Sequence, residues 1–168
     1  YTNLQTKIQI TDSKKLNHEQ RNELFQFFKN LQQNKTLEYH LGLATVEEID
    51  QLNILEATKL SMKRAVNKFH NPNVSLIIDG NFKLEHNHLK EKSVIRGDQI
   101  SLSIATASII AKIYRDRLMG FLDNKYQDYG WKKNVGYGTK KHIQAIKEKG
   151  FTNFHRKTFE PIKSLIRN

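Results

Sequence analysis

Two aspartates stand where an α/β protein could use them for chemistry. Asp79 directly follows an apolar run at residues 74–78, and Asp116 lies on a stretch with the pattern of a long helix. In open α/β sheets, ligands bind beyond the carboxyl ends of strands, where Asp79 would project. Carboxylate oxygens suit hard cations such as Mg²⁺, and two dications about 3.5 to 4 Å apart can clamp a reacting phosphodiester. We therefore predict a metal-dependent phosphodiesterase site containing Asp79 and Asp116.

Each aspartate also has a structural alternative. Asp79-Gly80 is a hairpin-turn signal, although the residues after Asn81 are too polar to pair well with an apolar strand. Asp116 could be an exposed helical acid paired with Lys112, a contact that stabilises a helix by only about 0.2 to 0.5 kcal/mol. The stripe that precedes Asp116 favours a sheet-facing position, because its small side chains allow a close approach. Its members are Ala105, Ser108, Ile109 and Lys112.

Two carboxylates alone do not balance two divalent cations. They supply two negative charges against four positive ones, so a complete two-metal site should contain further acids. Asp98, Asp123 and Asp128 have no placement at the end of a strand that recommends them.

The composition indicates a polyanionic partner. The chain has 28 Lys and Arg against 17 Asp and Glu, a formal net charge of +11 on 168 residues. Nucleic acid is the first candidate for such a basic chain, and a basic surface without such a partner is the alternative.

Cysteine is absent, which excludes disulfides and thiolate metal sites. No apolar run approaches the roughly 20 residues that cross a bilayer. We expect a soluble, cytoplasmic, monomeric protein with no membrane partner. The first residue is tyrosine, which is consistent with a start inside a larger protein.

The patterning along the chain predicts one α/β domain over residues 1–168, with a mixed or largely parallel sheet. Residues 4–10 are a strand or an extended arm, and Asn17 with Gln20 begins a helix. Residues 38–44 alternate like a half-buried strand. From Thr45, one long amphipathic helix should continue to Asn71-Pro72. Buried strands are expected at 74–78 and 93–95, the first covered on both faces by helices, and a further helix should run from Gly97-Asp98 to about residue 124.

The C-terminal segment mixes aromatic and basic residues. Tyr126, Tyr129, Trp131 and Tyr137 are interleaved with lysines, histidines and Arg156. Rings that stack on bases or sugars, together with cations that pair with phosphates, would suit a nucleic-acid surface. The alternative is that these rings pack the core of a C-terminal subdomain.

Several motifs, in order, resemble those of type 2 ribonuclease H (ribonuclease HII), and the match covers essentially the whole chain. They are Asp12-Ser13-Lys14-Lys15-Leu16, Ile49-Asp50-Gln51-Leu52-Asn53-Ile54-Leu55, Leu76-Ile77-Ile78-Asp79-Gly80-Asn81, Gly97-Asp98, Ser103-Ile104-Ala105-Thr106-Ala107-Ser108-Ile109-Ile110-Ala111-Lys112, Arg115-Asp116, Gly136-Tyr137-Gly138-Thr139 and His155-Arg156-Lys157-Thr158-Phe159.

The resemblance implies a ribonuclease H-like mixed sheet flanked by helices, with a helical C-terminal extension. It also implies Mg²⁺- or Mn²⁺-dependent endonucleolytic cleavage of RNA in RNA·DNA hybrids, including single ribonucleotides in duplex DNA. Asp79 and Asp116 match catalytic, metal-binding acids of the family. Ser13, Lys14 and Lys15 lie in its phosphate-contacting segment, and Tyr137 matches a tyrosine that stacks on a sugar.

The chain departs from the family at its front. The family opens with a strand carrying Asp-Glu-x-Gly-Arg-Gly, which supplies two catalytic acids and contacts to the ribose 2′-hydroxyl, and this sequence is absent here. We interpret the chain as a ribonuclease HII without its first strand, in which the isolated fragment is nearly inactive. A non-catalytic basic nucleic-acid-binding module is the alternative function.

Overall fold

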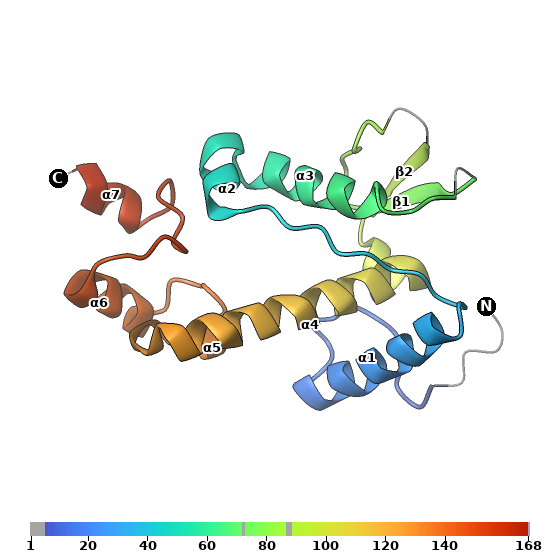
Figure 1. Cartoon of the computed structure of the whole chain (residues 1–168), viewed down its shortest axis with the longest axis horizontal. Coiled ribbons are helices and arrows are strands. Elements are labelled where there is room, and N and C mark those ends of the chain that lie inside the picture. Colours follow the sequence, from blue (N-terminus) through green and yellow to red (C-terminus); the bar gives the residue numbers. More distant parts are fainter. Residues whose placement is uncertain (1–5, 72, 87–88, 168) are drawn as a thin grey trace. The chain divides into compact units, whose positions relative to one another are not determined.

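The computed structural model describes residues 6–71, 73–86 and 89–167. It contains a two-stranded sheet among helices (Figure 1), which confirms the predicted α/β class and is consistent with a ribonuclease H-like fold. The elements are α1 (His18–Gln33), α2 (Val46–Leu52), α3 (Ile54–Val66), β1 (Ser75–Asp79), β2 (Lys90–Val94), η1 (Gly97–Gln99), α4 (Leu102–Lys125), η2 (Gln127–Tyr129), α5 (Trp131–Asn134), α6 (Lys140–Lys149) and α7 (Ile162–Arg167). Within the described ranges, every helix is too short or too polar to span a bilayer.

The chain forms two compact units, and each is described by itself. The first unit comprises Tyr1–Leu41 and Val66–Tyr114, and the second comprises Gly42–Ala65 and Arg115–Asn168. Helix α4 therefore contributes its N-terminal half to the first unit and its C-terminal half to the second.

The core of the first unit lies between α1 and the first half of α4. Leu24, Phe25 and Phe28 of α1 pack with isoleucines of α4, among them Ile109, which is fully buried. Burial of each such side chain contributes about 1.5 to 3 kcal/mol. The predicted capping box is present, because Asn17 and Gln20 exchange hydrogen bonds of 2.9 Å between side chain and backbone.

The sheet of the first unit is parallel. Strand β1 pairs with β2 so that Asp79 is opposite Val94. A parallel neighbour excludes a hairpin directly after Asp79, since two adjacent strands of a hairpin are antiparallel. The chain leaves β1 through Gly80, whose φ of 110° favours glycine.

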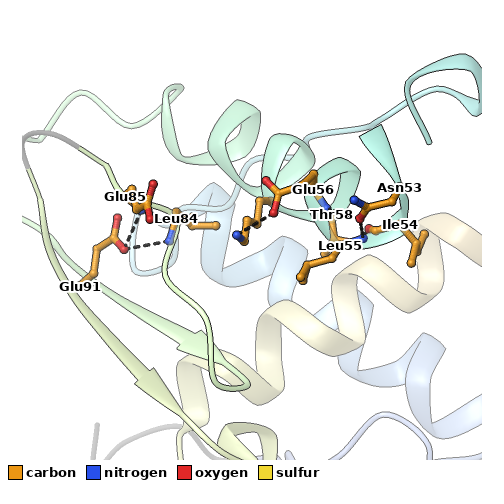
Figure 2. Close-up of polar contacts among 9 residues, drawn as sticks. Asn53, Ile54, Leu55, Glu56, Thr58, Leu84, Glu85 and Glu91 are labelled. Carbon is orange, nitrogen blue, oxygen red and sulfur yellow. Dashed lines mark hydrogen bonds and ion pairs between the residues drawn. The ribbon is translucent and has the colours of Figure 1, made fainter. Parts of the chain in front are cut away.

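Glu91 of β2 holds the segment that connects the two strands. Its carboxylate accepts backbone N–H groups from Leu84, Glu85 and His86 at 2.9, 3.1 and 2.5 Å; Figure 2 shows the first two. Burial raises the pKa of Glu91, but these three hydrogen bonds and the nearby His86 lower it further, so its pKa lies below the usual value. The connection is thus fixed by an ionised side chain.

Two strand predictions differ from the structure. Residues 38–44 form no strand: Tyr39 and Leu41 pack against the core while Leu43 is 69% exposed, so the alternation is real but no described strand pairs with it. Residues 6–10 are also not a strand, which contradicts one of the two alternatives for this segment and leaves the extended arm, and residues 4–5 lie outside the described residues. Alternating burial indicates only that one face of an extended segment is covered. A β-strand also needs a neighbouring strand with which its backbone forms hydrogen bonds.

The buried strands are present with shifted bounds. Strand β1 begins one residue later than expected, and β2 begins earlier and ends before Ile95, which is 70% exposed. The prediction that β1 is covered on both faces is wrong for the described chain, because Ile78 is 5% exposed and Ile77 is 41% exposed.

The single long helix expected after Thr45 is wrong, because the chain breaks at Asn53. This residue has φ 72°, and its Oδ1 accepts N–H groups from Leu55 and Glu56 at 2.9 and 3.2 Å, which caps α3 (Figure 2). Asparagine tolerates positive φ and is a strong N-cap. The pattern of Asn53 with Glu56 three residues later was a second start signal inside the apparent helix.

The core of the second unit is aromatic. Trp131 is 2% exposed and Tyr129 is 5% exposed, and their rings stack at 5.2 Å. His142 and His155 are both 5% exposed and stack at 5.3 Å. Met119, Leu122, Ala145, Ile146 and Ile162 complete this cluster, with Tyr126 packed against it.

Candidate active site

Asp79 lies exposed at the carboxyl end of β1, as the sequence predicted. Its Oδ1 accepts the backbone N–H of Gly97 at 2.8 Å, and in the described part of the chain Oδ2 makes no hydrogen bond. One oxygen therefore fixes the side chain, and the other is available to a ligand.

Gly97 brings the loop after β2 close to Asp79. A Cβ at Gly97 would overlap Cδ1 of Ile104 and lie 3.5 Å from Oδ1 of Asp79, so a larger residue would force the Ile104 side chain to shift. The Gly97-Asp98 motif thus has a structural reason: its glycine allows the contact that orients the predicted metal ligand.

Asp116 is half-buried on the part of α4 that belongs to the second unit. Asp79 belongs to the first unit, so the proximity of the two carboxylates stays a prediction. Carboxylate oxygens such as the unbonded Oδ2 of Asp79 fit Mg²⁺ or Mn²⁺ chemically. No group of three or more potential metal ligands occurs among the described residues. A dication site that includes both Asp79 and Asp116 likewise stays a prediction.

The segment Asp12-Ser13-Lys14-Lys15 forms a tight turn. Asp12 accepts the N–H of Lys14 on Oδ1 at 2.9 Å and the N–H of Lys15 on its carbonyl at 3.0 Å. Both lysine side chains are exposed, and Ser13 is buried with its hydroxyl 3.0 Å from that of Ser108 on α4. The turn is anchored to α4 by Ser13 and presents two cations to solvent. A direct contact of Ser13 with substrate stays a prediction.

Tyr137 lies on the loop after α5, and its side chain is 74% exposed. Asn134 holds this loop: its carbonyl accepts the N–H of Tyr137 and its Oδ1 accepts that of Gly136, both at 2.8 Å. Asn134 is itself buried and donates from Nδ2 to the carbonyl of Tyr129 at 2.7 Å. A fixed loop with an open ring can stack on a sugar or a base.

Three other C-terminal aromatics, Tyr126, Tyr129 and Trp131, belong to or pack against the core. Tyr129 and Trp131 belong to the buried core and Tyr126 packs against it, so for these three rings the alternative of core packing is confirmed and the nucleic-acid surface is not. The lysines that follow Trp131, at 132, 133, 140 and 141, are exposed. The spacing of aromatic residues among polar ones is the same whether the rings line a surface or fill a small core. A chain that turns between them can bring the rings together, and the spacing alone does not show this.

Sequence reasoning missed the role of Asp50. This carboxylate on α2 accepts the N–H of Lys157 at 2.8 Å, and the N–H and hydroxyl of Thr158 at 3.0 and 2.7 Å. Burial raises the pKa of Asp50, but the hydrogen bonds from Thr158 and Lys157 outweigh it and lower the pKa. Asp50 thereby fastens the segment 155–159 to α2. The only signal was that both segments stand among the quoted motifs.

Comparison with known proteins places the chain in a family. The family model described as Ribonuclease HII matches residues 1–162. The ribonuclease HII of Wolbachia pipientis subsp. Culex pipiens (strain wPip) is 46% identical over 93% of this chain and 76% of its own length. That of Macrococcus caseolyticus (strain JCSC5402) is 44% identical over 95% of this chain and 58% of its own length. The ribonuclease HII of Pelagibacter ubique (strain HTCC1062) is 43% identical over 94% of this chain and 82% of its own length.

The chain thus spans less than two thirds of some relatives and about four fifths of others. The match confirms the predicted resemblance and, at the level of the family, the predicted enzyme class, since the relatives are named as ribonucleases. This chain belongs to the ribonuclease HII family.

Proposed function

We propose that this chain supplies most of a divalent-metal-dependent endoribonuclease that cleaves RNA in RNA·DNA hybrids, including single ribonucleotides in duplex DNA. The cleavage leaves 3′-hydroxyl and 5′-phosphate ends. The observation that supports this most strongly is the placement of Asp79, at the end of a parallel strand with one oxygen bonded to Gly97 and the other open to a ligand.

In this proposal, Asp79 and Asp116 hold Mg²⁺ or Mn²⁺. A bound dication would polarise the phosphate and lower the pKa of a water. The chain's own residues bind and orient the substrate. Lys14 and Lys15 pair with backbone phosphates, and the ring of Tyr137 stacks on a sugar next to the cleaved position. We also propose that the protein works as a cytoplasmic monomer.

The 168-residue chain should bind hybrids but cleave them poorly. Asp79 and Asp116 leave two dications short of negative charge, and nucleophile and leaving group are then not held in line. The chain also has no Asp-Glu-x-Gly-Arg-Gly segment, the family's contact to the 2′-hydroxyl by which a protein distinguishes RNA from DNA. Supplying this segment in cis should restore cleavage and ribose selectivity.

The alternative is a basic module that binds nucleic acid without turnover, for which the net charge of +11 is the specific observation. One assay distinguishes these two functions. A duplex with a single ribonucleotide is incubated with Mg²⁺ or Mn²⁺ and with the chain carrying the added segment, and products are resolved by length. Cuts at the ribonucleotide support the enzyme. Salt-sensitive binding without any cut under either metal would reject it in favour of the module.

A matched control guards against a contaminating nuclease. The same protein with Asp79→Asn should bind the duplex with nearly unchanged affinity and give no product. Robust cleavage by the 168-residue chain without the added segment would show that other acids complete the site.

A further inference from the structure

Val135, two residues before Tyr137, has an unusual backbone conformation. Its φ is 50° and its ψ is 28°, which lies in the left-handed region. Among the described residues other than glycine, five have a positive φ, and Val135 is the one β-branched residue of the five. A β-branched side chain is crowded by the backbone in this region, so the conformation costs free energy. It persists only where the surrounding structure holds it.

Three hydrogen bonds hold this turn. The N–H of Val135 donates to the carbonyl of Trp131 at 2.8 Å, at the end of α5. The next two N–H groups, of Gly136 and Tyr137, both donate to Asn134, the first to its Oδ1 and the second to its carbonyl, each at 2.8 Å. The side chain of Val135 also packs against the aromatic core of the second unit. The backbone is therefore fixed on both sides of the strained residue.

Asn134 is itself fixed by that core. The residue is buried, and its Nδ2 donates to the carbonyl of Tyr129 at 2.7 Å. The same carbonyl lies 3.0 Å from Nδ1 of His142 on α6, and since a carbonyl only accepts, this nitrogen carries the proton. A buried amide that lost its partners would be left unsatisfied, which is costly. The core thus determines where Asn134 lies, and Asn134 determines the path of the loop.

The loop orders the backbone of Tyr137 and leaves its ring open. The N–H of Tyr137 donates to Asn134, and its carbonyl accepts the N–H of Thr139, the N-cap of α6, at 2.8 Å. The side chain nevertheless is mostly exposed. The fold therefore maintains a strained turn under a ring that contributes little to the core.

We propose that Asn134 and Val135 are positioning residues that hold the ring of Tyr137 ready to stack on the nucleotide it contacts. Ordering a side chain on binding lowers affinity, and a loop that is ordered beforehand avoids this loss. The hydrogen bonds to Asn134 offset the strain in the free protein, so binding does not have to provide that free energy. This inference rests on the proposed function, because it assumes that Tyr137 contacts the substrate.

The test is a double-mutant cycle with Tyr137→Ala. Affinities of the 168-residue chain for a one-ribonucleotide duplex are measured by fluorescence anisotropy. Asn134→Ala removes the acceptor of the Gly136 N–H and should weaken binding roughly two- to tenfold, the usual cost of ordering one side chain. When Tyr137→Ala is already present, the same substitution should weaken binding by less than about twofold, because no ring is left to position. A general loss of the fold would act equally in both backgrounds.

Val135→Gly separates positioning from stability. Glycine adopts a positive φ without strain but also many other conformations. Relief of strain should offset the lost packing, so the melting temperature should change little while the loop becomes mobile. Affinity should fall by about the same factor as in Asn134→Ala, again only when Tyr137 is present. The amides of Gly136 and Tyr137 should exchange their hydrogens faster than in wild type, as measured by NMR. This variant decides the question even if Asn134→Ala unfolds.

Tyr129→Phe is the matched control. It removes another hydrogen bond of the same core, from the Tyr129 hydroxyl to the carbonyl of Gly150 at 2.9 Å, and leaves Asn134 its partners. It should lower the melting temperature and leave the affinity and the exchange of the loop amides unchanged. Asn134→Ser keeps a weaker acceptor for the Gly136 N–H and should retain more affinity than Asn134→Ala.

Two results would overturn the inference. If Asn134→Ala and Val135→Gly bind like wild type, or lose as much affinity with Tyr137→Ala as without it, they do not act through the ring and only this inference fails. If wild type does not bind the duplex, or Tyr137→Ala binds it as tightly as wild type, the proposed contact of the ring fails and the inference fails with it.

Discussion

The cores of the two units are built from different chemistry. In the first unit, aliphatic side chains and phenylalanines of α1 and α4 meet at helical spacing. In the second, Tyr129, Trp131, His142 and His155 fill the core, and their polar atoms need partners: the Tyr129 hydroxyl donates to the carbonyl of Gly150 at 2.9 Å, and Nδ1 of His142 lies 3.0 Å from the carbonyl of Tyr129. Hydrophobic periodicity recognises the first kind of core. It does not recognise the second, which resembles a polar surface.

The units also differ in the side chains that they would present to the proposed substrate. The first presents Asp79 at a strand end and two lysines on a turn fastened by Ser13. The second presents Tyr137 on a loop fastened by Asn134. In each unit, a buried polar side chain holds the segment that displays an exposed one.

The largest expected effect is the loss of cleavage when Asp79 or Asp116 is replaced. It tests whether one active site contains a carboxylate from each unit. Asp79→Asn and Asp116→Asn should each reduce cleavage on the order of a thousandfold or more, because each removes a charge aimed at the metals. The measurement is single-turnover cleavage of a one-ribonucleotide duplex by the chain with the added segment. Hybrid affinity and thermal stability should stay nearly unchanged. If only one of the two carboxylates matters, the site belongs to one unit and the assignment is wrong.

Replacing one large buried ring in each unit by alanine compares how much the two cores stabilise the fold. Phe25→Ala in the first unit and Trp131→Ala in the second should each lower the free energy of unfolding by about 3 to 5 kcal/mol, because both rings are buried and leave a cavity. Urea titration gives the loss. Hydrogen exchange of the untouched unit then shows whether the units unfold together. A loss below 1 kcal/mol for Trp131→Ala would mean that the aromatic core adds little.

The histidine core should make the second unit sensitive to acid. Burial and the neighbouring His142 lower the pKa of His155 from 6.5 to about 4, against a backbone hydrogen bond with Thr152 that acts in the opposite direction. The unfolded chain therefore binds the proton first as the pH falls. Stability should be complete above pH 6.5 and decline as the pH drops toward 4, by up to roughly 3 kcal/mol.

Urea titrations between pH 7 and 4 would measure this slope. His155→Asn offers an acceptor for the Thr152 N–H but cannot titrate, so it should flatten the part of the slope that belongs to His155. An identical slope in wild type and variant would assign the acid sensitivity to other groups, such as Glu91 and Asp50, whose pKa values are lowered in the folded state.

The smallest effect concerns Tyr137. Tyr137→Ala should weaken binding to a one-ribonucleotide duplex by about 1 to 3 kcal/mol, the usual contribution of a stacked ring, and Tyr137→Phe should weaken it much less. Both variants should keep the wild-type melting temperature, because the side chain is exposed. Equal losses from the two substitutions would show that the hydroxyl, and not the ring, makes the contact.

The sequence by itself determined the features that depend on near neighbours. The capping boxes at Asn17 and Thr45, the strand ending in Asp79 and the long helix after Gly97 all follow from spacing within a few residues, since local hydrogen bonds and one-sided burial define them. The order of the motifs similarly sufficed to predict the family.

Only the tertiary structure decided which of these features share a neighbour. Parallel pairing of β1 with β2 excluded a hairpin at Asp79, and residues 38–44 form no strand although their burial alternates. Trp131 is buried and Tyr137 is exposed, although the sequence suggested a stacking role for both. The bonds from Asp50 to Thr158 join positions 108 residues apart. Contacts of this kind depend on how distant segments pack, and no periodicity within a window of residues encodes them.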